Sequence, residues 1–170
     1  MTKPTDYLTD LSHERLKEIL HYDPLTGNWT WLVKVANRKT GTVAGNINIS
    51  TGYYVIAINY RDYQAHRLAW FYMTGKWPND QIDHIDQNKL NNRWDNLREA
   101  TPQQNNRNVP VRKNSTTGIT GVVIRRSSHV ARIKVNKKYI HLGSYKTEAE
   151  AIRARQEAEI KYFGEFRSTY

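Results

Sequence analysis

The chain has 170 residues, which suits one medium-sized domain or two small ones, and its lack of cysteine excludes disulfides, a disulfide-linked partner and cysteine-based zinc sites. Its 26 lysines and arginines outnumber its 16 aspartates and glutamates, and the net charge of +10 points to a polyanionic partner, either nucleic acid or an anionic membrane surface. No apolar run approaches the ~18 residues of a membrane span and Met1–Asp10 is too polar for a signal peptide, so we expect a cytoplasmic protein.

A helix followed by a β-rich region is predicted for the first part of the chain. Leu8–Tyr22 carries apolar residues on one face, with Ser12 or Thr9 as the N-cap, which indicates a packing helix. Trp29–His66 is predicted to be an antiparallel β region because it is rich in aromatic and β-branched residues. Its expected parts are strands at 28–32, 53–58 and 63–66 and a turn at 59–62.

Another helix and then a compact polar segment follow. His66–Met73 is predicted to be helical and to end at Gly75, because glycine commonly terminates helices. Thr101 and Gln104 have the spacing of a capping box, with Pro102 at the first helical position, so a short helix is predicted to begin there. The expected order is a strand that ends at 83–84, a polar loop, a return strand around 96–97 and this short helix.

The polar segment from 81 to 108 contains residues with a specific chemistry. Asp83 and His84 are adjacent, and Asn96 and Asn105 follow His84 by twelve and twenty-one positions. The carboxylate of Asp83 and the amide oxygen of Asn105 are hard donors that suit Mg²⁺. A histidine beside such a cation can take a proton from water near neutral pH. Metal, base and phosphate together predict hydrolysis of a phosphodiester.

This set of residues resembles the HNH nuclease motif and its ββα-metal fold, in the branch found in phage and intron-borne homing endonucleases. The resemblance implies that His84 is the general base, that Asp83 and Asn105 hold one Mg²⁺ or Mn²⁺ per active site, and that Asn96 braces the loop and orients His84. It also implies 5′-phosphate and 3′-hydroxyl products. Neighbouring asparagines are alternatives for these roles: Asn91, Asn92, Asn106 and Asn108.

Three basic side chains near the motif are candidates for supporting roles. The sequence H-R-L-A-W from His66 to Trp70 also resembles the same nuclease branch. His66 and Arg67 are therefore candidates for contacting the site or a phosphate, with helix packing as the alternative. Arg98 is a candidate for additional phosphate stabilisation.

The composition changes after Asn108. Residues 109–117 are polar and basic, which predicts a linker that lies along nucleic acid, with Arg112 and Lys113 as phosphate contacts. Residues 118–170 are predicted to form strands at 121–126, 130–135 and 139–142 and a helix at 147–162. Thr147 and Glu150 form the capping box of that helix, and four of its residues are expected to pack on the sheet: Ala149, Ile152, Ala158 and Ile160.

Alternation along the three strands separates two faces of the predicted sheet. The apolar face is expected to cover the helix and comprises Val122, Ile124, Ala131, Ile133, Val135, Ile140 and Leu142. The outward face is mostly basic and aromatic and comprises Val123, Arg125, Arg132, Lys134, Tyr139 and His141. Because a small β-ribbon fits the major groove of DNA, this outward face is predicted to bind duplex DNA.

The same segment resembles the DNA-binding domain of plant ethylene-response factors, the Apetala type. The residues that carry the resemblance are T-G-I-T-G-V from Thr117, A-R-I-K from Ala131, H-L-G-S-Y from His141 and the helix that ends Y-F-G-E. In the plant domains the outward face carries arginines and tryptophans. Here Val123, Tyr139 and His141 stand at some of those positions, so base specificity does not transfer.

We therefore expect an α+β protein with a nuclease domain at 1–108, a linker at 109–117 and a DNA-binding domain at 118–170. The N-terminal β-rich region leads into the ββα-metal motif, and a three-stranded antiparallel sheet on one helix follows. The predicted function is a homing-endonuclease-like DNA endonuclease that nicks one strand per active site, as a monomer or weak homodimer in a phage-infected cell. The alternatives are a non-catalytic DNA-binding regulator with a decayed nuclease module, and a nuclease that acts on RNA.

Overall fold

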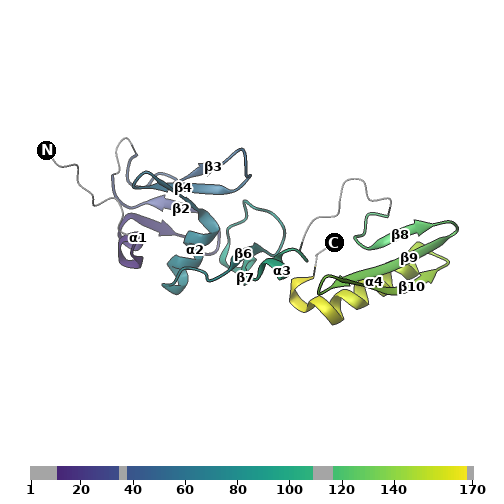
Figure 1. Cartoon of the computed structure of the whole chain (residues 1–170). Coiled ribbons are helices and arrows are strands. Elements are labelled where there is room, and N and C mark those ends of the chain that lie inside the picture. The colour runs from purple at the N-terminus through teal and green to yellow at the C-terminus, as the bar shows by residue number, and fades with distance from the viewer. Residues whose placement is uncertain (1–10, 35–37, 109–116, 168–170) are drawn as a thin grey trace. The chain divides into compact units, whose positions relative to one another are not determined.

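The computed structural model describes residues 11–34, 38–108 and 117–167 (Figure 1). Arg112 and Lys113, the predicted phosphate contacts of the linker, lie outside these ranges. The contacts within the chain divide it into two units, Met1–Thr101 and Pro102–Tyr170, which are considered separately below. The predicted domain limits at 108 and 118 stay a prediction.

The first unit begins with a helix that is shorter than expected. Helix α1 spans His13–Ile19, and Ser12, one of the two predicted N-caps, accepts a hydrogen bond from the N–H of Arg15. The chain then leaves the helix for strand β1, Leu20–Tyr22, which pairs with β2, Trp29–Trp31. The predicted helix to residue 22 is wrong in its last turn, because this pairing buries Leu20 and Tyr22.

Strands β3, β4 and β5 form the second small sheet of the first unit, with β4 in the centre. Their bounds are Asn46–Ile47, Tyr54–Ile58 and Arg61–Gln64. The β4–β5 turn is the two-residue pair Asn59 and Tyr60, both with positive φ, which suits the twist of a tight hairpin. The expected turn at 59–62 is thus shorter, and β5 begins at Arg61.

Helix α2, Ala65–Thr74, covers these sheets and ends at Gly75 as expected. Its apolar face joins residues of α1, the sheets and the next hairpin in one core. The largest side chains that are fully buried there are Trp29, Trp31, Tyr22, Leu16, Leu20, Ile56 and Leu68. Fully burying each such side chain contributes on the order of 2 kcal/mol, so this core is the main support of the hairpin beside it.

The polar segment folds as strand β6, Gln81–His84, and strand β7, Leu97–Ala100, which pair antiparallel. A 3₁₀ turn, η2, at Trp94–Asn96 leads into β7. Helix α3, Pro102–Asn105, follows directly and belongs by its contacts to the second unit. The predicted order of strand, loop, strand and short helix is therefore present. The ββα-metal arrangement itself remains part of the proposal below.

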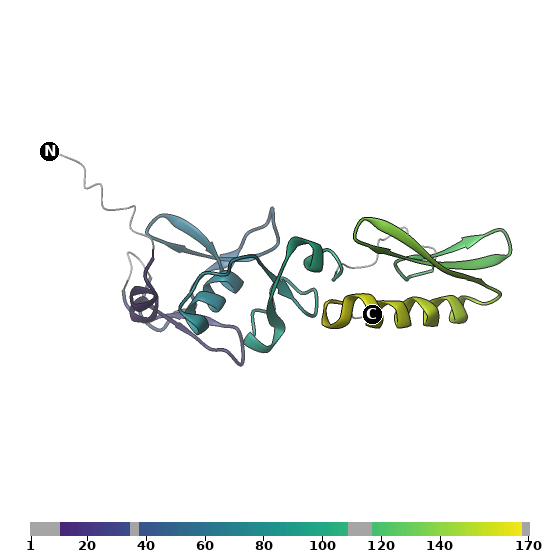
Figure 2. The same ribbon diagram turned by 60° about the horizontal axis from the view of Figure 1, so that its bottom comes forward.

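The second unit is a three-stranded antiparallel sheet with one long helix along it (Figure 2). The sheet order is β10-β9-β8, with bounds Val122–Arg125 for β8, Ser128–Val135 for β9 and Lys138–Tyr145 for β10. Helix α4 spans Glu148–Phe163, and the capping box of Thr147 and Glu150 is present in full. A short 3₁₀ turn, η3, at Gly164–Phe166 follows it.

Burial in the second unit confirms most of the predicted alternation and corrects three positions. Val122, Ala131 and Ile133 are fully covered beneath α4, whereas Ile124 is half exposed at the end of the sheet. Ala149 and Ile160, which were expected to pack, face solvent. The buried positions of α4 are instead Ala151, Arg155, Ala158, Glu159 and Phe163. A charged pair therefore occupies part of the helix face that an apolar pattern was expected to fill.

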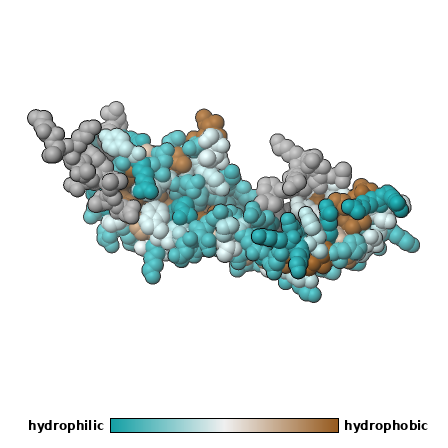
Figure 3. All heavy atoms as spheres, viewed as in Figure 1, coloured by the Kyte–Doolittle hydropathy of each residue, from teal (hydrophilic) through white to brown (hydrophobic). Residues whose placement is uncertain are grey.

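On the face drawn in Figure 3, apolar side chains of the first unit project at the β3–β4 turn. Ile49 in this turn is 96% exposed. Within the described ranges, each helix is too short or too polar to span a bilayer.

Candidate active site in the β6–β7 hairpin

The register of the β6–β7 hairpin places Asp83 directly opposite Arg98. Arg98 donates two hydrogen bonds to the same carboxylate oxygen, Oδ2, from Nε at 2.9 Å and from Nη2 at 2.7 Å. Both side chains are mostly buried, with 4% of Asp83 and 12% of Arg98 exposed. The guanidinium thus balances the charge of a carboxylate that would otherwise be costly to bury.

His84 lies next to Asp83 in the strand and packs against aromatic rings. Its imidazole centre lies 4.9 Å from that of His66 on α2, in an edge-to-face contact, and 6.1 Å from the ring of Tyr53. Burial lowers the pKa of His84, and the hydrogen bond with Asn92 and the charges of Asp86 and Asp83 oppose this effect only in part. The ring is therefore neutral at physiological pH and able to accept a proton.

The side chain of Asn92 contacts the imidazole of His84. The amide nitrogen of Asn92 donates to the carbonyl of Leu90 at 3.3 Å, so its oxygen Oδ1 faces His84. That oxygen lies 3.3 Å from Nε2 of His84 and can only accept. This contact favours the tautomer of His84 that carries its proton on Nε2.

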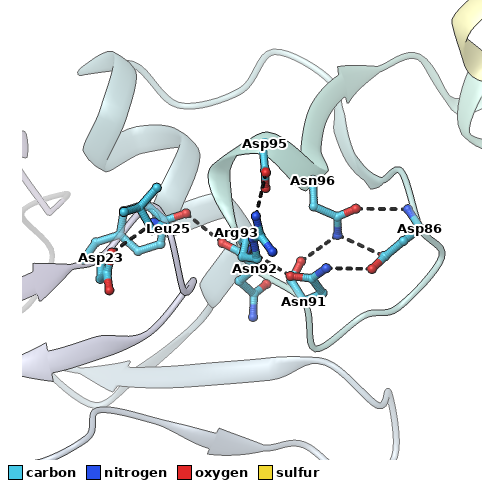
Figure 4. Close-up of polar contacts among 9 residues, drawn as sticks. Asp23, Leu25, Asp86, Asn91, Asn92, Arg93, Asp95 and Asn96 are labelled. Carbon is cyan, nitrogen blue, oxygen red and sulfur yellow. Dashed lines mark hydrogen bonds and ion pairs between the residues drawn. The ribbon is translucent and has the colours of Figure 1, made fainter.

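Asn96 braces the loop between the two strands (Figure 4). Its amide nitrogen donates to Oδ1 of Asp86 at 2.9 Å and to the carbonyl of Asn91 at 2.8 Å, while its oxygen accepts from the N–H of Asp86 at 3.0 Å. Burial raises the pKa of Asp86, but hydrogen bonds from Asn91, from the N–H of Asn88 and from Asn96 outweigh this and lower it overall. Asp86 is thus an ionised anchor for the loop.

Strand β1 and the turn after it contact the backbone of Asn92. Tyr22 donates its hydroxyl proton to the carbonyl of Asn92 at 2.7 Å, and burial raises the pKa of this hydroxyl above its usual range. Gly27 lies so close that a Cβ built on it would stand 2.5 Å from the carbonyl carbon of Asn92. The N–H of Trp94 also donates to the carbonyl of Pro24 at 3.0 Å, and the Trp94 ring packs against Trp70 of α2 at 5.3 Å.

The predicted neighbours of the site occupy defined places. Burial, with smaller contributions from His84 and Arg67, lowers the pKa of His66 to about 3, and its buried Nδ1 has no hydrogen-bond partner among the described residues. Arg67 donates to the carbonyls of Asp80 and Pro78, just before β6. Arg67 thus hydrogen-bonds the backbone just before β6, and Arg98 hydrogen-bonds the side chain of Asp83. Phosphate contacts by either residue stay a prediction.

The two side chains expected to bind the cation, Asp83 and Asn105, carry hard oxygen donors and belong to different units. Asp83 supplies a buried carboxylate, and Asn105 supplies an amide at the last position of α3. Such oxygen donors suit Mg²⁺ or Mn²⁺, which take one or two protein oxygens and keep several waters. Among the residues that the structure describes, no three His, Cys, Asp or Glu side chains gather as a metal cluster. Metal binding by Asp83 and Asn105 stays a prediction.

The outward face of the second unit collects the basic and aromatic side chains that were expected there. Tyr139 pairs with Lys134 and His141 pairs with Arg132 across β9 and β10, so all four share one face of the sheet. The guanidinium of Arg132 and the ammonium of Lys134 lie 5.0 and 5.4 Å from the centre of the Tyr139 ring. Arg125 is exposed on the same face at the end of β8. DNA binding by this face stays a prediction.

Comparison with known proteins finds that the segment containing the hairpin is similar to a nuclease family. Residues 63–107 match a family model described as HNH endonuclease. The chain therefore carries an HNH-type segment. It is 34% identical over 116 residues to an uncharacterized HNH endonuclease of Acanthamoeba polyphaga mimivirus, an alignment that covers 66% of this chain. It is 39% identical over 64 residues, 37% of this chain, to Protein 3.8 of Escherichia phage T7.

These relatives are matched over part of their length only. The chain spans 60% of the mimivirus protein and 53% of the phage protein. No solved structure matches the chain.

Two features of the site are not expected from the sequence. The sequence offers Asn92 only as an alternative to other asparagines, although it is the residue that contacts His84. For Tyr53 the sequence predicts an ordinary strand position, but its ring contacts both His66 and His84. The many asparagines in the loop indicate that one of them contacts His84. Nothing in the sequence position of Tyr53 connects it with the motif.

Proposed function

We propose that this chain is a metal-dependent DNA endonuclease of the HNH class that hydrolyses phosphodiester bonds. The observation that carries the proposal is the pair at the end of β6: a buried carboxylate, Asp83, beside a buried neutral imidazole, His84, within the HNH-type segment. A neutral histidine is the form that a general base requires.

His84 takes a proton from the attacking water on Nδ1, while the Asn92 oxygen holds the proton on Nε2 and fixes the orientation of the ring. Asn96 keeps the loop closed through Asp86. Asp83 and Asn105 hold one Mg²⁺ or Mn²⁺, which when bound stabilises the charge on the phosphate and on the leaving oxygen. The products are a 5′-phosphate and a 3′-hydroxyl.

The second unit, as an ethylene-response-factor-like domain, holds duplex DNA with its outward face. The residues proposed to contact DNA are Arg125, Arg132, Lys134, Tyr139 and His141, with Arg112 and Lys113 of the linker. One active site in each chain cuts one strand per binding event, whether the protein is a monomer or a weak homodimer. The likeness to viral proteins supports a role in the cytoplasm of an infected cell, with homing as the proposed class of activity.

The deciding experiment is plasmid nicking with Mg²⁺ by the wild type and by His84→Ala. Conversion of supercoiled DNA to the open circle should fall by about a hundredfold or more in the variant. Equal activity in both proteins contradicts the assignment of His84. Tight DNA binding with no nicking by the wild type would support the non-catalytic regulator instead. Stronger binding to duplex RNA than to duplex DNA would support a nuclease acting on RNA.

A further inference from the structure

Lys89, in the loop between β6 and β7, is held in place by the β3–β4 turn. Its ammonium donates to the carbonyl of Thr51 at 3.0 Å and lies 4.5 Å from the centre of the Tyr53 ring. The side chain is nonetheless exposed. An exposed lysine normally keeps most of its rotamers, so two anchors on one ammonium hold its charge at a defined point.

The anchor for Lys89 is itself rigid. In the β3–β4 turn the side-chain oxygen of Asn48 accepts from the N–H of Ser50, from the hydroxyl of Ser50 and from the N–H of Thr51, at 3.1, 2.8 and 3.2 Å. The N–H of Gly52 also donates to the carbonyl of Asn48 at 2.8 Å. The Thr51 carbonyl therefore occupies one position before any ligand arrives.

The held ammonium and the proposed general base contact the same aromatic ring. The Tyr53 ring that lies under Lys89 also contacts His66 at 4.9 Å and His84 at 6.1 Å between ring centres. One aromatic ring thus connects the cation with both imidazoles of the site. The β3–β4 turn, which belongs to a different sheet, becomes part of the wall around His84.

Among the residues that the structure describes, the charge of Lys89 is not balanced by an ion pair. The segment 81–100 has three lysine or arginine side chains, and two of them form ion pairs: Arg93 with Asp95 and Arg98 with Asp83. Within the described residues no carboxylate pairs with Lys89, and the Thr51 carbonyl uses one of the three N–H groups of its ammonium. Two donors and a full positive charge remain available for an anion.

We propose that Lys89 binds a backbone phosphate of the strand that is cut, next to His84. This inference rests on the proposed function and identifies a phosphate contact within it. A fixed cation loses little conformational entropy when the phosphate binds, so its charge contributes fully to binding and to the stabilisation of charge in the transition state. The tyrosine and the Thr51 carbonyl keep the ammonium from turning away into solvent.

The test compares Lys89→Ala and Lys89→Arg with Lys17→Ala. Lys17 is the matched control because it is also exposed and its ammonium also lies over a tyrosine ring, that of Tyr72 at 5.1 Å. Binding to a fluorescent duplex of about 30 base pairs, roughly three helical turns, is measured in EDTA over a range of salt concentrations. For Lys89→Ala the slope of log K against log salt should become smaller by about 0.9, the value for one phosphate contact. For Lys17→Ala it should equal the wild-type slope.

The slope decides the inference. An unchanged slope for Lys89→Ala, or an equal change for Lys17→Ala, overturns it even if nicking becomes slower. In single-turnover nicking with saturating protein, Lys89→Ala should be slower by roughly tenfold or more and Lys89→Arg should retain most of the rate. If His84→Ala nicks as fast as the wild type, the proposed function fails, but the EDTA binding experiment still decides whether Lys89 contacts a phosphate.

Discussion

In the part of the chain that the structure describes, both units bury an arginine–carboxylate pair, and the surroundings of the two pairs differ. In the first unit Arg98 meets Asp83 across two strands, beside two neutral imidazoles. In the second unit Arg155 meets Glu159 within helix α4, with 6% and 3% of the side chains exposed. Arg155 also donates to the carbonyl of Arg132 and lies 5.7 Å from the Phe163 ring. Burial of charge is thus common to both pairs, and what makes the first one a candidate site is the buried imidazole of His84 beside it.

The largest expected difference between the two pairs is in activity. Asp83→Asn should slow nicking on the order of a hundredfold or more, because it removes the charge of the proposed cation ligand while keeping the size of the side chain. Glu159→Gln should leave the rate close to that of the wild type when the protein saturates the DNA. Single-turnover nicking of a plasmid measures both. Comparable losses in the two variants would show that the pairs do not differ in function.

The next largest effect is on stability and belongs to the second unit. Glu159→Ala leaves the guanidinium of Arg155 buried without its partner, which should lower the free energy of unfolding by about 3–5 kcal/mol. The double variant Arg155→Met/Glu159→Leu should recover most of this loss, because apolar side chains of similar volume remove both charges. Urea denaturation followed by circular dichroism tests this. A double variant as unstable as the single one would argue against desolvation as the cause.

A glycine pair tests how closely the first unit supports its loop. Gly27 has φ of +75° and almost no room beside Asn92, whereas Gly41 has φ of +82° and no atom of a described residue within 4 Å of the place that a Cβ would take. Both alanine variants should lose about 1–2 kcal/mol from the left-handed backbone. Gly27→Ala alone should lose roughly another 1–3 kcal/mol and also slow nicking, because the loop must move. Equal losses of stability in the two variants would mean that the close approach to Asn92 is unimportant.

The effect that is smallest near neutral pH is the pH dependence of the first unit. The pKa of His66 falls from its ordinary 6.5 to about 3 in the folded chain, so the unfolded chain takes the proton first. The contribution of His66 to the free energy of unfolding is therefore complete above pH 6.5. It decreases as the pH falls toward 3, by about 1.4 kcal/mol per pH unit. His66→Phe keeps a ring against Tyr53 and should flatten the decrease between about pH 6.5 and 5. Identical pH profiles from urea denaturation would contradict the lowered pKa.

Structural elements that depend on local sequence patterns are predicted better than elements that depend on contacts between distant residues. The capping box at Thr147 is recognisable because its two residues are three positions apart, and the order of elements around Asp83 and His84 follows from a compact linear motif. By contrast, Leu20 fits the apolar face of the preceding helix as well as it fits a strand. Only its pairing with Trp31, eleven positions later, settles the choice.

Contacts between distant segments account for what the sequence does not predict. Tyr53 reaches His84 because β4 and β6 both pack on α2, which no spacing in the sequence reveals. On α4 the apolar pattern favours Ala149 and Ile160 as packing positions. The helix instead turns the Arg155–Glu159 pair inward, because each charge satisfies the other there. The roles of the individual site residues remain predictions that the variants above test.

The tryptophans described earlier have a practical consequence for spectroscopy. All five indoles of the chain, including the buried Trp29 and Trp31 and the Trp70–Trp94 pair beside the loop, belong to Met1–Thr101, whereas the aromatic residues of Pro102–Tyr170 are tyrosine and phenylalanine only. Emission excited at the red edge of the indole band therefore reports on the N-terminal unit alone. Melting of the C-terminal unit is silent in that signal, so one sample can show whether the two units unfold together or separately.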